Sequence, residues 1–277
     1  MKCRGKRDGK GGTALRGFLI LTAVFLLGPS GLAEESGSVH SLEGYSPEDR
    51  RMAEGILKNT TFQAENRMTF RADPDVLRYF IDHPDFAAAV SRGLGHDTFR
   101  VQWEDGRYRV FHGYARGTFW TVERKAGRAV YLARGVYDHP AFRWIGILLR
   151  ARSYVIESFE RASSPGAEAG SHDLQLSIRA YLFVENPVLG KIFGWIAPLI
   201  RRAFESKLTR AYRIAPELSQ MAFEGGSAFL EKVRKIEDLD PSLLRKFDLL
   251  VRKRTARQYS ERPPWSAGLK AGCRPGP

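Results

Sequence analysis

The histidines of this chain are the residues best suited to acid–base or metal chemistry, and their spacing favours neither. None has a second histidine one helical turn away with a carboxylate between them, as a zinc hydrolase motif requires. Asp82-His83-Pro84 and Asp138-His139-Pro140 repeat one pattern, but each stands where a segment ends, so turn formation is the simpler interpretation. The six histidines are His40, His83, His96, His112, His139 and His172.

Other catalytic signatures are also missing from the sequence. It contains no nucleophile elbow and no pair of cysteines two residues apart. Gly93-Leu94-Gly95 is too short for a phosphate-binding loop and follows a helical pattern. We therefore expect no metal and no cofactor, we assign no catalytic residue, and an enzyme is the less favoured interpretation.

Aromatic and aliphatic residues on the predicted strands and on one long helix favour a different chemistry, the binding of an apolar molecule. We expect these side chains to face one interior, where they would line a pocket if the sheet is curved enough to leave a space. Plain core packing is the alternative, and for most of these residues it is the favoured one. The predicted ligand-binding residues are Trp103, Trp120, Tyr131, Tyr154, Leu176, Ile178, Leu182, Ile196, Ile200 and Phe204.

Two stretches are more apolar than their positions require. Phe142–Leu149 lies between two strands, where a polar loop is expected, and Val188–Ile200 is apolar nearly all round. An apolar loop with tryptophan and nearby arginines suits the lip of a lipid-binding cavity, where guanidinium groups meet phosphates. The alternative is that the two stretches cover each other, or that the first is a buried edge strand. The predicted head-group or membrane contacts are Phe142, Trp144, Ile147, Leu148, Arg150, Arg152, Phe193, Trp195, Arg201 and Arg202.

One strand and the helix that follows it organise these candidates. Leu174–Val184 has an apolar residue at every second position, which is the period of a strand with one buried face. Asn186-Pro187 then supplies a helix N-cap and a first-turn proline, and apolar residues continue at helical spacing. Pro198 predicts a kink in that helix, and Pro216 predicts an end or a further bend.

The elements before this junction are short. Thr60–Arg71 is typical of a strand, and Asp73–Ile81 and Phe86–Leu94 are typical of two short helices. Five runs between Phe99 and Arg161 then follow at hairpin spacing, with turn residues between them. The order is one strand, two helices, six strands and one long helix, which predicts an α+β fold with a curved antiparallel sheet under the last helix.

This order, with Asp73-Pro74 after the first strand and Asn186-Pro187 at the last junction, resembles the START-like (helix-grip, SRPBCC) superfamily. That superfamily includes lipid-transfer domains and polyketide cyclase/dehydrase-like proteins. The resemblance covers residues 58–223 and implies a seven-stranded sheet wrapped around the long C-terminal helix, with a cavity for an apolar ligand between them. It supplies no shared catalytic residues. The leader and the C-terminal segment depart from the pattern.

The first 33 residues are typical of a secretory signal peptide. A basic region precedes the apolar core Gly17–Leu27, and small residues allow cleavage after Ala33. An uncleaved anchor is the alternative. The leader carries six Lys/Arg and one Asp, so its removal lowers the net charge from +13 to +8. We expect export to the periplasm, with residues 34–57 forming a linker that carries one short helix.

Residues 224–277 form a basic C-terminal extension with twelve Lys/Arg against seven Asp/Glu. Gly225-Gly226 breaks the helical pattern, and helices are expected near Ala228–Ile236 and from Pro241 to about Gln258. The last helix is amphipathic. It is typical of a membrane-surface element or, as the slightly favoured alternative, of a helix packed on the domain with a solvated basic face.

The sequence therefore predicts an exported, single-domain START-like protein that carries an apolar molecule, with a lipid as the leading candidate, beside a membrane. Nucleic acid is disfavoured as a partner, because the basic residues are not interleaved with exposed aromatics on the strands. One alternative is a cyclase/dehydrase-like enzyme that acts on a hydrophobic or aromatic substrate through Tyr131, Tyr154 or His112. Another is a non-binding domain that docks a partner and has a filled interior.

Overall fold

The computed structural model describes most of the chain after the predicted leader. The described residues are 42–96, 98–138, 149–162, 172–185 and 189–260. Within them, the side chains of residues 149, 189–201, 203–205, 207–208 and 255–260 lie outside the description. The predicted signal peptide, residues 142–148 of the apolar loop and the tail after residue 260 also lie outside the described residues.

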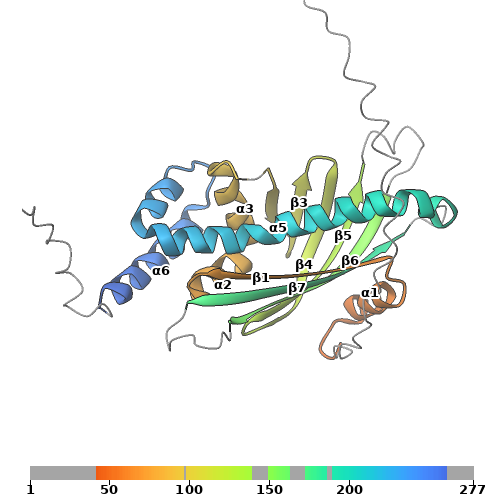
Figure 1. Cartoon of the computed structure of the whole chain (residues 1–277), viewed down its shortest axis with the longest axis horizontal. Helices are drawn as coiled ribbons and strands as arrows, with labels where there is room; N and C mark the ends of the chain where they lie inside the picture. Colours follow the sequence, from red (N-terminus) through yellow and green to blue (C-terminus); the bar gives the residue numbers. More distant parts are fainter. Residues whose placement is uncertain (1–41, 97, 139–148, 163–171, 186–188, 261–277) are drawn as a thin grey trace, which may run out of the picture. The chain divides into compact units, whose positions relative to one another are not determined.

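Seven strands of the described chain form one antiparallel sheet in the order β1-β7-β6-β5-β4-β3-β2 (Figure 1). Consecutive strands pair as hairpins from β2 to β7, and β1 joins the last strand, with Phe62 opposite Leu182 and Phe70 opposite Leu174. This confirms the predicted α+β class. The strands are β1 Phe62–Arg71, β2 Arg100–Glu104, β3 Arg107–His112, β4 Ala115–Lys125, β5 Arg128–Tyr137, β6 Leu149–Arg161 and β7 Asp173–Val184.

Two short helices follow β1, as the sequence predicts. α2, Pro74–Asp82, begins where the Asp73 side chain accepts hydrogen bonds from the backbone N–H groups of the first turn. α3, Pro84–Gly93, begins directly at the next proline. Each helix has one apolar face that is buried against later parts of the chain.

The long helix α5, Leu189–Arg234, crosses the concave face of the sheet, which gives the helix-grip arrangement (Figure 1). A side-chain hydrogen bond of 3.3 Å from Asn66 of β1 to Thr209 ties the helix to the sheet. The helix continues past Pro216, so the predicted end at that residue is wrong. Its backbone leaves helical values at Gly226, where φ is 46° and ψ is −116°, a conformation that glycine adopts without the steric cost of a Cβ.

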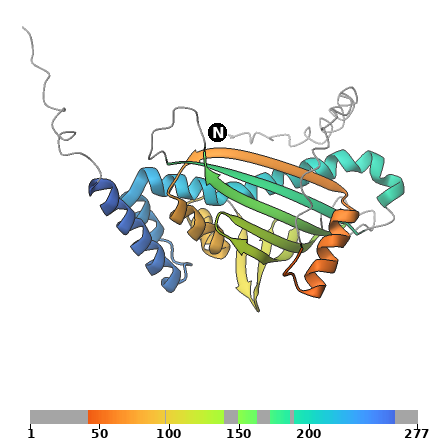
Figure 2. The same cartoon turned by 90° about the horizontal axis from the view of Figure 1, so that it is seen from below.

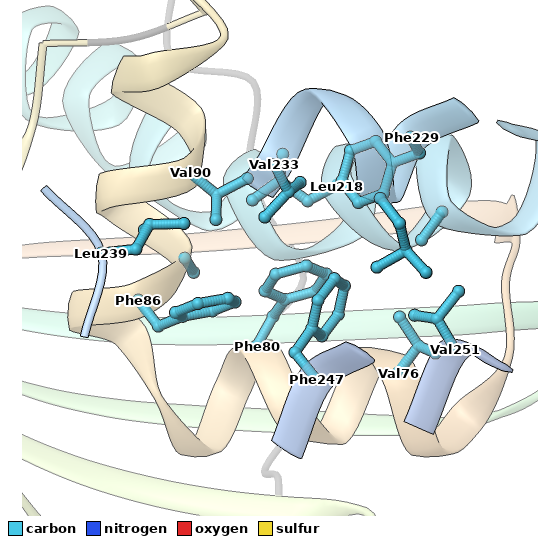
Figure 3. Close-up of a cluster of buried hydrophobic side chains, with 13 residues drawn as sticks. Val76, Phe80, Phe86, Val90, Leu218, Phe229, Val233, Leu239, Phe247 and Val251 are labelled. Atoms are coloured by element: carbon cyan, nitrogen blue, oxygen red, sulfur yellow. The ribbon is translucent and has the colours of Figure 1, made fainter. Parts of the chain in front are cut away.

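Beyond this break the chain folds back over α2 and α3. α6, Pro241–Ser260, buries Phe247 and Val251 in a cluster that also contains Phe80 and Phe86 (Figure 3). The apolar face of the last helix is therefore covered by the domain itself, as the packed-helix alternative predicts. The whole cluster is Val76, Phe80, Phe86, Ala87, Val90, Leu218, Ala222, Phe229, Leu230, Val233, Leu239, Phe247 and Val251.

Arg254 of α6 joins the end of the chain to the break in α5. Its guanidinium donates hydrogen bonds to the carbonyl oxygens of Ala222 (3.1 Å) and Phe223 (3.2 Å), in the turn just before Gly226. It also lies 3.7 Å from a carboxylate oxygen of Asp73 and 4.0 Å from the centre of the Phe223 ring. These contacts explain how an arginine is buried here at a modest energetic cost.

A different helix, α1, Pro47–Lys58, covers part of the convex face of the sheet. It packs against β6 and β7 and buries Ala53 and Ile56 completely, and α1 and α5 lie on opposite sides of the sheet (Figures 1 and 2). Trp120 donates from its indole nitrogen to Asp49 at 2.9 Å. The segment that the sequence assigns to a linker thus contributes a helix to the packed structure.

Candidate functional site

Strand register divides the side chains of the sheet between its two faces. Residues directly opposite each other across an antiparallel pair point to the same face. One such row runs from Ala129 through Glu157 and Ile178 to Asn66, and the next from Tyr131 through Val155 and Ala180 to Ala64. Since Asn66 contacts Thr209 of α5, both rows face the long helix.

The end of the concave face under α2 is filled. Phe70, Leu174 and Leu176 are buried there together with Leu77 and Ile81 of α2. Tyr212 and Ala215 of α5 pack against the same cluster. This half of the interior is an ordinary hydrophobic core and leaves no role for a ligand among these side chains.

A polar group stands at the edge of that core. Glu157 of β6 is only 5% exposed and accepts a hydrogen bond from the hydroxyl of Tyr131 on β5. The pKa of the Glu157 carboxyl is raised to about 7, with burial as the largest cause; the Tyr131 hydrogen bond and the charge of Arg124 oppose the rise, and the nearby Asp82 adds a smaller upward effect. Near neutral pH this carboxyl can therefore both donate and accept a proton.

Two phenols accompany the carboxyl. Burial, followed by the charge of Glu157, raises the pKa of Tyr131 and of Tyr212 well above the ordinary value. Both phenols therefore stay protonated and act as hydrogen-bond donors. Glu157, Tyr131 and Tyr212, with the Asn66–Thr209 pair beside them, are called the interior polar cluster below.

A small hollow reaches Glu157 from the strand ends near the β4–β5 turn. Its volume is about 50 Å³, and Arg124, Arg128 and Asp82 are among the residues around it. A space of this size holds one or a few water molecules, and the charged side chains among its otherwise apolar walls supply the partners that buried water needs. The carboxyl thus has a route along which a proton can exchange with solvent.

The other half of the concave face is lined by small and apolar side chains and is less tightly covered. It lies beyond the interior polar cluster, under the first half of α5, where β7 ends and the helix begins. Gly117 and Gly135 stand directly opposite each other in its middle. Side chains this small leave volume between a sheet and a helix. The half-buried small residues of this open half are Ala64, Ala115, Gly117, Ala133, Gly135, Ala151 and Ser153, and the larger half-buried side chains in the same rows are Phe62, Val110, Phe119 and Tyr137.

Several predicted ligand-binding residues do face the concave side. Tyr131, Leu176 and Ile178 are buried there, and Leu182 lies opposite Phe62 at the edge of the open half. Trp103 has the right register but stands on the edge strand β2 and is 56% exposed, with its ring 4.6 Å from that of Tyr108.

Trp120 and Tyr154 were expected in the same interior, and this prediction is wrong. Both point to the convex face, under α1, where the Tyr154 hydroxyl lies 3.3 Å from that of Tyr45. The apolar run Tyr154–Ile156 hides the alternation of β6, so the sequence does not show which of its residues face inward. His112, offered as a catalytic alternative, is buried with its ring stacked on Phe99 at 4.0 Å.

The predicted head-group arginines do not form one site. Arg150 and Arg152 are exposed on the convex face, whereas Arg202 is exposed on α5, which covers the concave face. The other predicted residues of this kind, and three expected in the pocket, lie outside the described residues or side chains. They are Phe142, Trp144, Ile147, Leu148, Phe193, Trp195, Ile196, Ile200, Arg201 and Phe204.

The interior polar cluster was not predicted, apart from Tyr131. One signal was available, because Val155, Glu157 and Phe159 share the parity of a buried strand face and the middle residue is an acid. Within the described residues there is no group of three or more metal-binding side chains of the His, Cys, Asp or Glu type. No helix of that same part of the chain is long and apolar enough to cross a bilayer.

Comparisons with known proteins match this chain at the level of structure alone. No family model matches it, and no curated protein does. A hypothetical protein of Helicobacter pylori is similar over 60% of this chain and 93% of its own, with 11% identity and a TM-score of 0.38. A conserved protein of Geobacillus kaustophilus is similar over 58% and 97%, with 8% identity and a TM-score of 0.37.

A plant enzyme is among the similar structures. Norcoclaurine synthase of Thalictrum flavum, solved with dopamine and hydroxybenzaldehyde, is similar over 55% of this chain and 88% of its own, with 9% identity and a TM-score of 0.30. At these levels no residue role passes from those proteins to this one. The assignment of the chain to the α+β helix-grip architecture rests on its own strand order and on the helix across the sheet.

Proposed function

We propose that this protein binds an apolar molecule between the open half of the concave face and the first half of α5, as the START-like resemblance implies. The observation that carries the proposal is the contrast between the two halves of one sheet face. The half under α2 is packed with large buried side chains, whereas the open half has alanine, glycine and serine at seven positions that remain half-buried under the helix, with Phe62, Phe119 and Tyr137 also only half-buried beside them.

Binding would be driven by transfer of apolar surface out of water, worth about 0.8 kcal/mol for each buried CH₂ group. The interior polar cluster closes the inner end of this space, where Tyr131 and a protonated Glu157 offer hydrogen bonds to one polar end of a ligand. A molecule with an apolar body and one polar terminus, such as a lipid, fits both features.

The proposed location is outside the cytoplasm, beside a membrane, and it rests on the leader sequence. Cleavage after Ala33 predicts a mature protein that begins at Glu34. Mass determination of the protein recovered from the periplasm tests this directly. A mass that retains the first 33 residues would instead support an uncleaved anchor.

The ligand itself is tested by native mass spectrometry of the mature protein as isolated, followed by solvent extraction. Ala133→Phe would fill the open half and is expected to remove the bound molecule. Ala126→Phe, in the exposed turn between β4 and β5, adds the same ring outside the site and should retain it. If the wild-type protein carries no small molecule, or both variants retain it equally, the binding site is not here.

A second function, an acid–base enzyme acting in the same space, is favoured by one observation. The pKa of Glu157 lies at about 7, where a general acid or base works best near neutral pH. An enzyme would hold its product in the wild-type protein and its unreacted substrate in Glu157→Gln. Recovery of the same molecule from both proteins would exclude catalysis by this carboxyl and leave binding alone.

A further inference from the structure

The convex face carries two adjacent rows of arginines that neither the fold nor the proposed interior site requires. In one row Arg109, Thr118, Arg134 and Arg152 stand directly opposite one another on β3, β4, β5 and β6. In the next row Arg116 of β4 and Arg150 of β6 flank Val136. The rows are neighbours on one face, so five guanidinium groups share a small area.

This arrangement opposes folding more than a mixed surface would. Arg134 and Arg152 form a directly opposed cross-strand pair of like charge, which is unfavourable. Two of the five are compensated, because Arg152 pairs with Glu185 and Arg109 lies 2.6 Å from Glu104. Among the described residues no carboxylate pairs with Arg116, Arg134 or Arg150.

The arginines surround a hollow instead of a flat surface. α1 forms one wall, with Arg51 and Met52, and the hollow has a volume of about 750 Å³. Phe111, which is 41% exposed, adds an apolar patch to the arginine rows. Six arginines and two glutamates, Glu48 and Glu185, line the hollow, so the side chains around it carry a net charge of +4.

We propose that this hollow, called the arginine groove, binds a phosphate-bearing anion. Guanidinium groups pair with phosphate oxygens through two parallel hydrogen bonds, and several of them on fixed strands suit a group with more than one negative oxygen. The volume falls within the range of small-molecule sites. The phosphate belongs either to a soluble phosphate ester or to the head group of an anionic lipid, and both present the same chemistry.

The groove is independent of the apolar site, because the sheet separates it from the concave face. Arg150 and Arg152, which the sequence places at the lip of the interior cavity, belong to this surface instead. Loss of ligand from the concave side therefore leaves binding at the arginine groove unchanged, and the two proposals fail separately.

The test uses the mature protein and the double variant Arg134→Gln/Arg150→Gln. Pyrophosphate and glycerol 3-phosphate are titrated by calorimetry at low ionic strength, and vesicles of phosphatidylcholine with or without phosphatidylglycerol are used for co-sedimentation. The matched control is Arg245→Gln/Lys246→Gln, which removes two exposed positive charges from α6. The groove variant is expected to bind the phosphate probes at least about tenfold more weakly than the wild-type protein, since charged hydrogen bonds are removed. The control variant is expected to lose much less affinity for the same probes.

The pattern across the probes identifies the source of the phosphate. Loss of binding to soluble phosphates alone assigns a free ester, and loss of binding to phosphatidylglycerol vesicles alone assigns a lipid head group. Loss of both also supports a phosphate site. The proposal is overturned if the wild-type protein binds none of these probes, or if the control variant loses as much affinity as the groove variant. A thermal melt of each variant shows that it is folded.

Discussion

Glu157→Gln tests whether the interior carboxyl is neutral in the folded protein. The substitution keeps the size of the side chain and its ability to accept the Tyr131 hydrogen bond, but it removes ionisation. The groups that face the carboxyl are Tyr131 from β5, Tyr212 from α5, Arg124 from β4 and Asp82 from α2. Burial is the largest influence, and it favours the neutral acid.

The sign and size of the effect follow from the two states of the chain. The ordinary pKa of this carboxyl is 4.5 and its pKa in the folded protein is about 7. Below pH 4.5 the carboxyl is protonated in both the folded protein and the unfolded chain, so it does not change the free energy of unfolding with pH. Between these values the unfolded chain releases a proton that the folded protein retains, so stability falls as pH rises, by a total of about 3 kcal/mol.

The assay is chemical denaturation of wild type and variant at about pH 4 and about pH 8. Between the lower and the higher pH, the free energy of unfolding of the variant should rise relative to that of wild type by about 3 kcal/mol. This corresponds to roughly 6 to 12 °C in melting temperature. Comparing the two pH values cancels any fixed cost of burying an amide. Glu160→Gln, an exposed position on the same strand, controls for the lost charge.

A variant whose stability differs from that of wild type by the same amount at both pH values would refute this reasoning. It would mean that the folded protein ionises Glu157 as readily as the unfolded chain does. The acid–base function proposed above would then lose its support, whereas apolar binding in the open half would not.

Four other substitutions, one of them a control, test separate parts of the structure. Arg134→Gln should raise the free energy of unfolding by roughly 0.2 to 1 kcal/mol, because it removes the like charge opposite Arg152. This gain in stability should shrink at high salt. A loss of stability would contradict the unfavourable pairing. Gly226→Ala should lower the free energy of unfolding by about 1 to 3 kcal/mol, because a Cβ is strained at the backbone angles of this residue. Gly55→Ala within α1 is the control and should raise the free energy of unfolding by roughly 0.5 to 1 kcal/mol. Equal melting temperatures for these two variants would exclude a strained break. Arg254→Met should cost about 1 to 3 kcal/mol by leaving carbonyl groups unpaired, and an unchanged denaturation midpoint would show that they find other partners.

The order and type of the elements could be predicted from the sequence, because local signals coincide with each boundary. Asp73-Pro74 does cap α2, the alternation of Leu174–Val184 matches the buried face of β7, and Gly226 does mark the break in the long helix. The predicted end at Pro216 was wrong, since packing of α5 against the sheet and α2 outweighs one missing backbone donor.

Which face a strand residue occupies was harder to predict. Trp120 and Tyr154 were assigned to the concave side because they are aromatic, yet α1 buries them from the other side. A sheet covered on both faces is apolar on both, so period-two alternation disappears where the second cover lies. The arginine rows depend on register across four strands, which is a long-range property that spacing within one strand does not contain.

The pairing of β1 with β7 and the cluster around Phe80 and Phe247 have a consequence for how the chain is made. Phe62 pairs with Leu182, and Phe80 packs against Phe247 and Val251, so the partners of both residues are synthesised much later. A growing polypeptide therefore holds unsatisfied aromatic surface until its final helix has been synthesised. The first strand and the first two helices therefore complete their packing only after the end of the chain has left the ribosome.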